Sequence, residues 1–321
     1  MIIRQIILLI MRSSILVGGQ AVINGVMMRV PGAYATAVRI QDGSIKSKAV
    51  SFISLSEKNK IFKLPILRGA INLFEAMKIG YSTLTWSASF TEDEDKKPNL
   101  FIEIIMNIIS MIFAMSLFLF LPIFIASYSV DPNNVIIFNI ISGAVRITLF
   151  LIYLILISML KDVKILFQYH GAEHKTIFTF EDGQELCYEK AKQYKKEHPR
   201  CGTSFLFIVM MVAIFSFSLI DSVALLLLNI ELSIINRLIL HLFCMPLVAG
   251  FSYEVLKILA RNMGQNKIID SLAMPGLFLQ KITTKNPNKD QLEVAFEALK
   301  VAFGDRYNSI KGKKFKADAI G

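Results

Sequence analysis

Four long apolar segments constrain the fold of this chain more than any other feature of its sequence. They run from Leu100 to Val130, from Val135 to Leu160, from Ser204 to Ile230 and from Ser233 to Ala260. As helices, with a rise of about 1.5 Å per residue, all four are long enough to cross the hydrocarbon core of a bilayer. Hydrophobic residues make up 54% of the 321, which is too many for two ordinary soluble domains. We therefore expect an α-helical membrane protein with four transmembrane helices.

Short turns pair these segments into hairpins, Asp131–Asn134 in the first and Glu231–Leu232 in the second. The lysines and arginines behind the net charge of +10 avoid both turns and crowd into the first hundred residues, into 161–200 and into the tail after Ala260. The positive-inside rule then places both termini and the central segment in the cytoplasm. We interpret the charge as topogenic and predict no specific nucleic acid. For the basic tail Lys311–Lys316, anionic lipid and a cytoplasmic protein or ribosomal partner remain as alternatives.

The apolar segments divide the chain into six parts. These are an N-terminal extension (1–17), a β-rich α+β region (18–99), a transmembrane hairpin (100–160), a His/Cys loop (161–203), a second hairpin (204–260) and a C-terminal tail (261–321). For the extension we expect a surface-lying anchor, or an upstream start with initiation at Met11. The three cysteines show no disulfide pattern and are expected to be free thiols.

The region before the first hairpin is expected to form a small cytoplasmic sheet. Gln20–Met28 is rich in strand-forming residues, and Tyr34–Phe52 alternates around Asp42-Gly43, a strong hairpin signal. From Pro65 to Trp86, apolar residues at near-helical spacing predict a helix that lies on the membrane or packs against the sheet.

The tail holds two further apolar stretches. We expect Pro275–Thr284 to be a turn-bounded apolar segment and Asp290–Phe303 to be an amphipathic helix. Both are expected to pack back onto the central loop.

His170-Gly171-Ala172-Glu173-His174 is the segment that points most directly to chemistry. On a helix, His170 and His174 stand one turn apart on the same face, which lets two imidazoles reach one ion. His-x-x-Glu-His is also the inverted zincin pattern, in which both histidines bind zinc and the glutamate polarises a water. Glu173 is therefore the candidate general base, and a divalent metal, zinc before others, is the candidate cofactor.

A second cluster adds to this interpretation, because His198 and Cys201 supply an imidazole and a soft thiolate at ligand-like spacing. The second and third spans bring both clusters to the same face of the membrane. Glu254, at the cytoplasmic end of the fourth span, is a candidate ligand in the role of the downstream glutamate of inverted zincins; pairing with Lys257 or Arg261 is the alternative. Four protein ligands would close a structural site, whereas a catalytic site keeps one position open, and the sequence leaves both possibilities standing.

The ionisable residues that also fall within or near the apolar segments include Arg146, Asp221, Arg237 and His241. Charges in the hydrocarbon region are costly unless they are partnered. We expect them to pair between helices, with a proton or ion path as the alternative.

Several motifs occur in an order that resembles the bacterial YqhQ family over nearly the whole chain. They are Gly18–Ile23, Gly25–Arg29, Pro65–Gly69, His170–Lys175, Pro199–Phe205, Pro275–Leu277 and Ile282–Thr284. The resemblance implies a multi-pass protein of the bacterial cytoplasmic membrane with a metal site. The family is described as a predicted metal-dependent enzyme. The resemblance does not identify a substrate. The family pattern has glutamate at the position of Asn24 and glycine at that of Val30. If that glutamate is a base or a ligand, this member is weakened or inactive in that role.

Three functions follow from these observations. The leading hypothesis is a metal-dependent hydrolase that acts on a peptide or a lipid-linked group at the inner leaflet, with His170, His174, His198 and Cys201 as ligands and Glu173 as base. The second is a non-enzymatic membrane scaffold or assembly factor held by structural zinc. The third is a transporter, which four spans could form only as a homo-oligomer. No complete phosphate-binding fingerprint is present, so no nucleotide cofactor is assigned.

Overall fold

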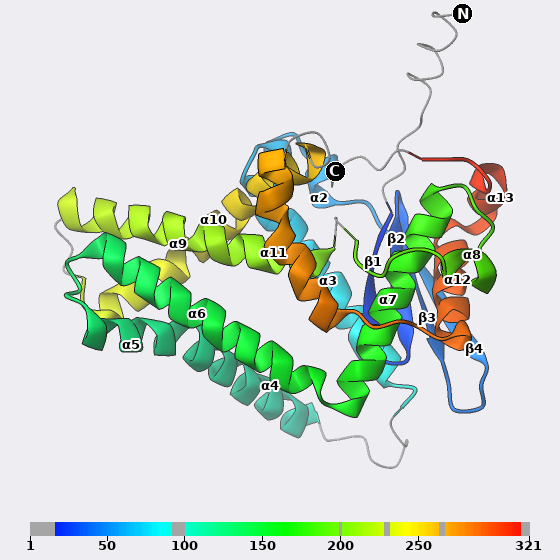
Figure 1. Ribbon diagram of the computed structural model, residues 1–321, viewed down its shortest axis with the longest axis horizontal. Helices are drawn as coiled ribbons and strands as arrows, with labels where there is room; N and C mark the ends of the chain where they lie inside the picture. Colours follow the sequence, from blue (N-terminus) through cyan, green and yellow to red (C-terminus); the bar gives the residue numbers. More distant parts are fainter. Residues whose placement is uncertain (1–16, 92–99, 199–200, 228–231, 263–266, 316–321) are drawn as a thin grey trace, which may run out of the picture.

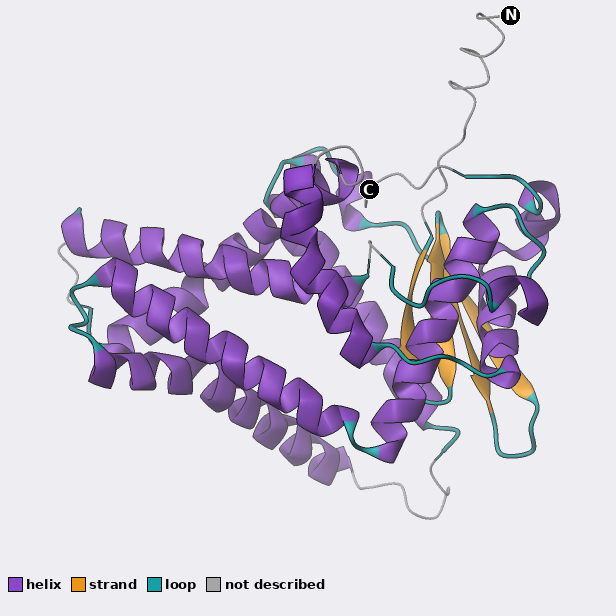
Figure 2. Cartoon of the chain, viewed as in Figure 1, coloured by secondary structure: helices purple, strands orange, loops and turns teal. Residues whose placement is uncertain are grey.

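The structure, a computed structural model, describes residues 17–91, 100–198, 201–227, 232–262 and 267–315 (Figure 1). Figure 2 shows a group of long helices on one side and a smaller part built around a β-sheet on the other. The anchor or alternative start expected in the N-terminal extension falls on residues 1–16, outside the described residues. The helices, in chain order, are α2 (Leu55–Lys58), α3 (Leu67–Ala88), α4 (Leu100–Met115), α5 (Leu121–Ser129), α6 (Val135–Ser158), α7 (Lys161–Glu181), α8 (Tyr188–Ala191), α9 (Gly202–Leu226), α10 (Ile234–Asn262), α11 (Lys267–Thr283), α12 (Lys289–Phe303) and α13 (Tyr307–Ile310).

Four antiparallel strands form the sheet in the order of the chain: β1 (Gly18–Val22), β2 (Gly25–Val30), β3 (Ala33–Arg39) and β4 (Ile45–Ser51). The strand-rich segment Gln20–Met28 contains parts of two strands, β1 and β2. A tight turn divides it, where Asn24 takes a φ of +51°, a conformation that asparagine adopts more readily than most residues. The predicted turn at Asp42-Gly43 is confirmed, because β3 and β4 pair across it and Gly43 has a φ of +84°.

Both faces of the sheet are covered by helices. Val26 and Met28 of β2 point to one side and pack into a core with residues of α7 and α12. Met27, between them, points to the other side and packs with Ile79 of α3. This alternation is the two-residue period of a strand. The sheet is therefore the middle layer between α3 and the pair α7 and α12.

The C-terminal helix α12 is predicted correctly as an amphipathic helix. Asn288 and Gln291 form a reciprocal capping box at its start, which satisfies two backbone amides that have no partner within the helix. Its apolar side, including Leu292, Ala295 and Leu299, is fully buried against the sheet and α7. The chain thus closes the N-terminal sheet, which ends at Ser51, with a helix that begins only at Lys289.

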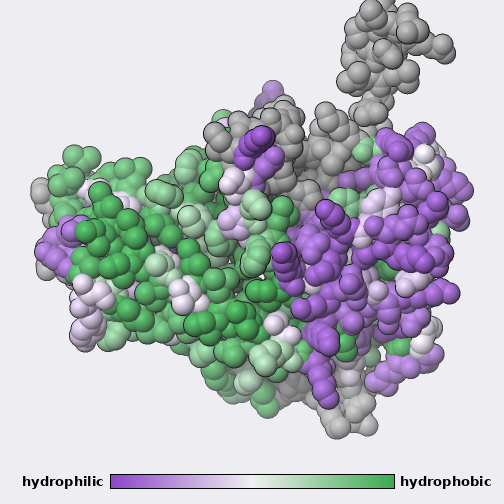
Figure 3. Space-filling model, viewed as in Figure 1, coloured by the Kyte–Doolittle hydropathy of each residue, from purple (hydrophilic) through white to green (hydrophobic). Residues whose placement is uncertain are grey.

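The four predicted apolar segments form helices long and apolar enough to cross a membrane: Phe101–Ser129, Val135–Ser158, Leu206–Leu226 and Ile234–Leu256. Figure 3 shows that hydrophobic residues cover the surface of this bundle, whereas hydrophilic residues cover the part that contains the sheet. A surface of this size and composition is stable in lipid rather than in water. The bundle therefore indicates a membrane-associated protein.

The second span and the helix that carries His170 are separate helices. α6 ends at Ser158, and Leu160 adopts an extended conformation, with ψ of 138°, before α7 begins at Lys161. In Figure 1, α7 turns away from α6 and runs along the sheet. The first half of the expected His/Cys loop is therefore a helix of 21 residues, and the chain returns to α9 through the short helix α8.

Pro275–Thr284 is not a turn-bounded segment, and this prediction is wrong. Pro275 lies inside α11, which runs on to Thr283. A proline within a helix removes one backbone hydrogen bond, yet α11 continues through it because the helix packs along α9 and α6. The last residue of α11 is Thr283, whose backbone carbonyl contacts His170.

Candidate metal centre

Helix α7 places three chemically important side chains together. His170 and His174 are one turn apart, with ring centroids 4.4 Å from each other. Glu173 extends from the same turn, and its Oε2 is 3.9 Å from Nε2 of His170. The helical spacing predicted from the sequence is therefore present in the structure.

Cys201 approaches these side chains from the start of the third span. It is the N-cap of α9, and its Sγ accepts a hydrogen bond from the backbone amide of Thr203 at 3.4 Å. The same Sγ is 3.1 Å from Nε2 of His170. A thiolate at this position faces the positive end of the α9 dipole. The ligand atoms of His170, His174 and Cys201 all lie within 4.8 Å of one another, which is a spacing that one metal ion can bridge.

Backbone carbonyls fix the orientation of both imidazoles. Nδ1 of His170 is 2.8 Å from the carbonyl oxygen of Thr283, and Nδ1 of His174 contacts the carbonyl oxygen of Lys196. Because a carbonyl can only accept, each Nδ1 carries the hydrogen and each neutral ring has its lone pair on Nε2. Nε2 of His174 is buried and, within the described parts of the chain, has no hydrogen-bond partner. Metal-binding histidines typically have this arrangement, with a carbonyl or carboxylate on the second ring nitrogen.

The loop that carries Cys201 is held to its surroundings through its backbone. The side-chain amide of Gln280, on α11, donates to the carbonyl of His198 at 2.8 Å and accepts from its amide at 2.7 Å. The ammonium of Lys175, on α7, donates to the carbonyls of Lys192 and Tyr194. These bonds join α7, α11 and the loop, so the positions of His174 and Cys201 depend on tertiary structure rather than on local sequence.

Glu173 has the electrostatics of a proton-transfer group. Its burial raises the pKa to about 7, against the opposing influence of His170 and of a hydrogen bond from the backbone of Gly19. Burial dominates because a carboxylate loses more solvation than these two partners return. Near neutral pH both forms of this side chain are therefore populated.

Two glycines allow the backbone to come close to the site. A Cβ on Gly171 would lie 2.0 Å from the carbonyl oxygen of Lys285, where the chain leaves α11 and crosses α7. A Cβ on Gly19 would lie 2.8 Å from Cγ of Glu173. A side chain at Gly171 would push α7 away from the segment after α11, and a side chain at Gly19 would push β1 away from α7.

The structure places the other predicted site residues differently. His198 is buried beside the group and its ring lies against those of Phe178 and His174, with centroid distances of 4.5 and 5.5 Å, but it is not one of the three clustered ligands. Glu254 is not one of them either. Both of its carboxylate oxygens accept from the guanidinium of Arg68, at 2.7 and 2.5 Å. The proposed partners Lys257 and Arg261 have side chains outside the described residues.

The charged residues of the spans pair between helices, as predicted. Asp221 of α9 accepts from Asn139 of α6 at 2.8 Å, lies 3.1 Å from Nε of Arg237 and 2.9 Å from Nε2 of His241, both on α10. Arg146 donates to a backbone carbonyl of the first span at 2.9 Å. The contacts of Asp221 lie near the end of α9 and the start of α10, at the opposite end of the bundle from the His/Cys group.

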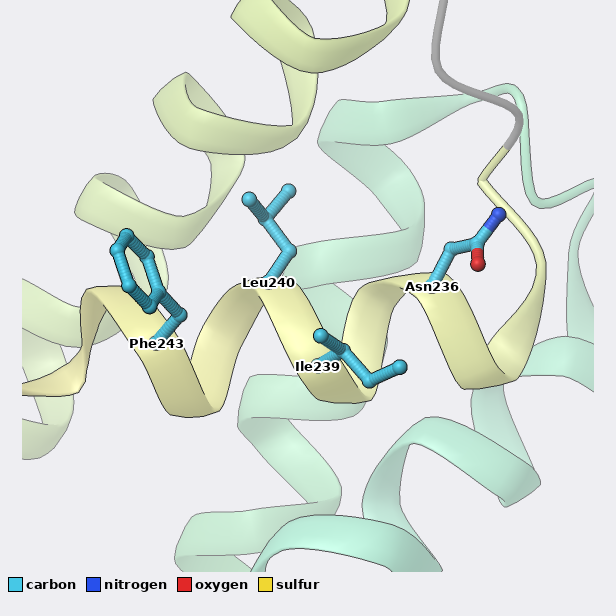
Figure 4. A pocket seen from close by; sticks show the side chains of 4 residues that line it. All are labelled: Asn236, Ile239, Leu240 and Phe243. Carbon is cyan, nitrogen blue, oxygen red and sulfur yellow. The ribbon is translucent and has the colours of Figure 1, made fainter.

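A shallow hollow on the outer surface of α10 is lined by Asn236, Ile239, Leu240 and Phe243 (Figure 4). All four residues belong to one helix, at the end of the bundle that is far from Cys201. This hollow therefore contributes nothing to the candidate metal centre.

Sequence analysis did not identify the residues that orient the ligands. Thr283 and Lys196 act through backbone carbonyls, which no side-chain motif reports. Thr283 lies within the Ile282–Thr284 motif and Gly19 within Gly18–Ile23, so the resemblance marked both segments without indicating their role. For Gln280, an amide inside an otherwise apolar stretch was the available signal.

Comparisons with known proteins agree with the motifs. No solved structure shows significant similarity to this chain. The "Uncharacterized protein YqhQ" of Bacillus subtilis (strain 168) is 32% identical over 310 residues, which cover 88% of this chain and 90% of that protein. A family model described as "Protein of unknown function (DUF1385)" matches residues 64–305, a range that includes His170, Glu173, His174 and Cys201. The chain therefore belongs to the DUF1385 family, to which the resemblance to YqhQ pointed.

Proposed function

We propose that this protein is a membrane-associated, metal-dependent hydrolase in which His170, His174 and Cys201 bind one zinc ion and Glu173 is the general base. The arrangement of His174 carries the proposal. Its Nδ1 is bonded to a carbonyl, while its buried Nε2 has no hydrogen-bond partner among the residues that the structure describes. A ring nitrogen of His174 lies within 4.8 Å of the ligand atoms of His170 and Cys201. A buried polar atom without a partner is costly, and a cation bound by all three ligand atoms would satisfy it.

The chemistry of the ligands favours zinc. Two imidazole nitrogens and one thiolate form a borderline-soft set that suits Zn²⁺ better than magnesium or calcium, which prefer oxygen. Catalytic zinc sites have three protein ligands and keep the fourth position for water or substrate. The group of three in this structure matches that pattern.

In this proposal, zinc and the residues around its ligands divide the catalytic roles. Zinc would supply Lewis acidity, which lowers the pKa of water toward neutrality and polarises a carbonyl. Glu173 takes the proton from the attacking water and returns it to the leaving group. A pKa of about 7 suits this double role, because the side chain must both accept and donate at neutral pH. The amide of Gly19 orients the carboxylate.

The position of the site suggests the class of substrate. His170 and His174 lie midway along α7, which packs against the sheet, and Cys201 lies where α9 enters the third span, at the end of the bundle next to the sheet. With the sheet and both termini in the cytoplasm, this end faces the inner leaflet of a bacterial cytoplasmic membrane. The substrate is then a peptide or a lipid-linked group presented at that surface.

A structural zinc in a non-enzymatic scaffold is the second candidate. It is favoured by the burial of the ligands, since His174 is only 1% and Cys201 only 7% exposed. The centre also joins α7, α9 and, through Thr283, α11, as a structural ion does. Such a site needs a fourth protein ligand, and His198 is the nearest candidate by ring contacts.

Cobalt substitution of the purified full-length protein separates these functions. Elemental analysis should first find about one zinc per chain. The Co²⁺ form should show a thiolate-to-metal band that is absent in Cys201→Ser and kept in the control Cys187→Ser. A small hydroxamate should shift the ligand-field bands if one position is open, and should leave them unchanged if four protein ligands close the site. If the purified protein contains no zinc and also binds no Co²⁺, the proposed metal centre is refuted.

A further inference from the structure

Helix α3 exposes a stripe of large apolar side chains although it is not one of the four spans. Phe74 is 68%, Met77 66% and Tyr81 58% exposed, and Leu67 and Leu84 are each 38% exposed. Residues three and four apart lie on one side of a helix, so these five side chains form a continuous stripe. A contiguous apolar surface of this kind marks a contact with lipid or with another protein.

The opposite side of α3 is already in use. Ile79 and Thr83 are buried, Ile79 within the smaller core of the sheet. Oγ of Ser87 accepts from the backbone amide of Ile23 at 3.1 Å, and Gly80 lies directly against the side chain of Gln20. The sheet therefore covers one side of α3 and leaves the apolar stripe uncovered.

The start of α3 is attached to the end of the fourth span. A Cβ on Gly69 would lie 2.7 Å from the carbonyl oxygen of Gly250, so the two backbones meet without intervening side chains. Beside this crossing Arg68 pairs with Glu254, and Nδ2 of Asn72 donates to the hydroxyl of Tyr253 at 3.0 Å. In Figure 1, α3 then runs obliquely across the end of the bundle, between the long helices and the sheet. The stripe thus begins at the level where the last span ends.

Basic residues surround the apolar surface. Lys58, Lys60 and Lys63 are exposed just before α3, and Ile61 and Leu64 between and after them are also exposed. Lys78 is exposed on α3 itself, beside the stripe. Alternation of cationic and apolar side chains is typical of helices that lie in the head-group region of membranes with anionic lipids.

We propose that α3 is an in-plane membrane helix, with its Leu67–Leu84 stripe inserted at the boundary of head groups and acyl chains and its flanking lysines on anionic head groups. The contacts between α3 and α10 fix the depth at which α3 lies in the membrane, and the apolar stripe contacts the lipid. Because α3 also holds β1, which contacts Glu173 through Gly19, this helix sets the height of the sheet and of the candidate metal centre above the bilayer. The proposal does not depend on metal binding or on hydrolysis.

Tryptophan fluorescence in nanodiscs tests this placement directly. Trp86 is the only tryptophan of the chain, so Trp86→Phe gives a silent background. Phe74→Trp and Tyr81→Trp would each be placed in that background, in the full-length protein, in nanodiscs of phosphatidylcholine and phosphatidylglycerol that carry a doxyl quencher near the head group or near the acyl terminus. Lys48→Trp, exposed on β4, is the control outside the membrane, and Phe215→Trp, 71% exposed within the third span, is the control inside it.

We expect Phe74→Trp and Tyr81→Trp to lose most of their fluorescence with the shallow quencher and less with the deep one. Phe215→Trp should show the reverse order, and Lys48→Trp should be quenched by neither. Emission at both α3 positions that is insensitive to both quenchers would overturn the proposal. The same conclusion follows if that emission is blue-shifted but unquenched, which would assign the stripe to a protein partner or a second copy of this chain.

Discussion

Nε2 of His170 lies 3.1 Å from Sγ of Cys201, although 31 residues separate them. The two side chains come from different helices, one packed on the sheet and one at the start of the third span. In the described part of the connection between these helices, Lys175 and Gln280 hold the backbone of Lys192 and His198. The candidate metal centre is therefore a product of how the sheet, the loop and the bundle meet.

His170→Ala and His174→Ala should each reduce the zinc content from about one per chain to a small fraction, because two remaining ligands bind zinc weakly. His198→Ala should keep most of the metal, since His198 is not among the three clustered ligands. Elemental analysis of the three purified variants measures this difference. Equal loss in His198→Ala and His174→Ala would instead indicate four protein ligands and a closed site.

Gln280→Ala should weaken metal binding although Gln280 is not a ligand. Without its two hydrogen bonds to His198, the loop that positions Cys201 and the Lys196 carbonyl is less ordered. Loss of such supporting contacts typically lowers metal affinity by about 10- to 100-fold. Competition with a chelator measures the affinity, with Gln193→Ala, on the exposed side of the same loop, as the control. If Gln280→Ala binds the metal as tightly as the control variant, the two hydrogen bonds between Gln280 and His198 are not needed for metal binding.

The metal-free protein should become less stable as the pH rises from 4.5 to about 7. The folded-state pKa of Glu173 is raised from 4.5 to about 7 by burial, so the folded state binds this proton more tightly than the unfolded state. The resulting stabilisation is fully present below 4.5 and is lost as the pH rises to about 7. It amounts to at most roughly 3 kcal/mol. Thermal unfolding between these pH values should show the decline, and Glu173→Gln should flatten it; the same slope in both proteins would be inconsistent with this origin.

Gly171→Ala should destabilise the junction of α7 with the segment after α11. The new Cβ would meet the carbonyl oxygen of Lys285 at 2.0 Å, and a backbone oxygen cannot move aside as a side chain can. We expect a loss of about 1–3 kcal/mol, in the range of other overpacking substitutions. Gly202→Ala, which meets nothing within 4 Å, is the matched control in a thermal unfolding measurement and should be close to neutral. If the two variants have similar thermal unfolding midpoints, the close approach of Gly171 to the Lys285 carbonyl is contradicted.

Within the spans, Asp221 and Arg237 should be strongly coupled. Each is fully buried. Removal of Asp221 takes away the carboxylate that faces Arg237, and removal of Arg237 leaves Asp221 with only its contacts to Asn139 and His241, each at a cost of about 3–5 kcal/mol. Asp221→Leu and Arg237→Leu should therefore each be strongly destabilising, while the double variant should lose much less than their sum. A double-mutant cycle from unfolding in detergent measures the coupling. Additive losses would mean that the pair makes no net contribution.

Local patterns predicted several elements correctly because their cause is local. The four spans follow from segment length and hydropathy, the β3–β4 turn from Asp42-Gly43, and α12 from its helical periodicity. The composition of Gln20–Met28 predicted strand but did not locate the turn within it, because apolar content alone does not mark a turn and Asn24 supplies the positive φ. Pro275 was misjudged because the packing of α11 along α9 outweighs one lost hydrogen bond.

By itself, the sequence determined that this chain forms a hydrophobic helical bundle beside a small sheet, and it determined the one-turn spacing of His170 and His174. These features depend on residues that are near one another in the chain. The sequence had already named Cys201 as a candidate ligand, but only the tertiary structure decided that its Sγ lies beside His170. It also decided that the carbonyls of Thr283 and Lys196 orient the rings and that Glu254 pairs with Arg68. These contacts join segments far apart in the sequence, and the two carbonyls belong to the backbone, which is the same for every residue type, so local side-chain patterns do not reveal them.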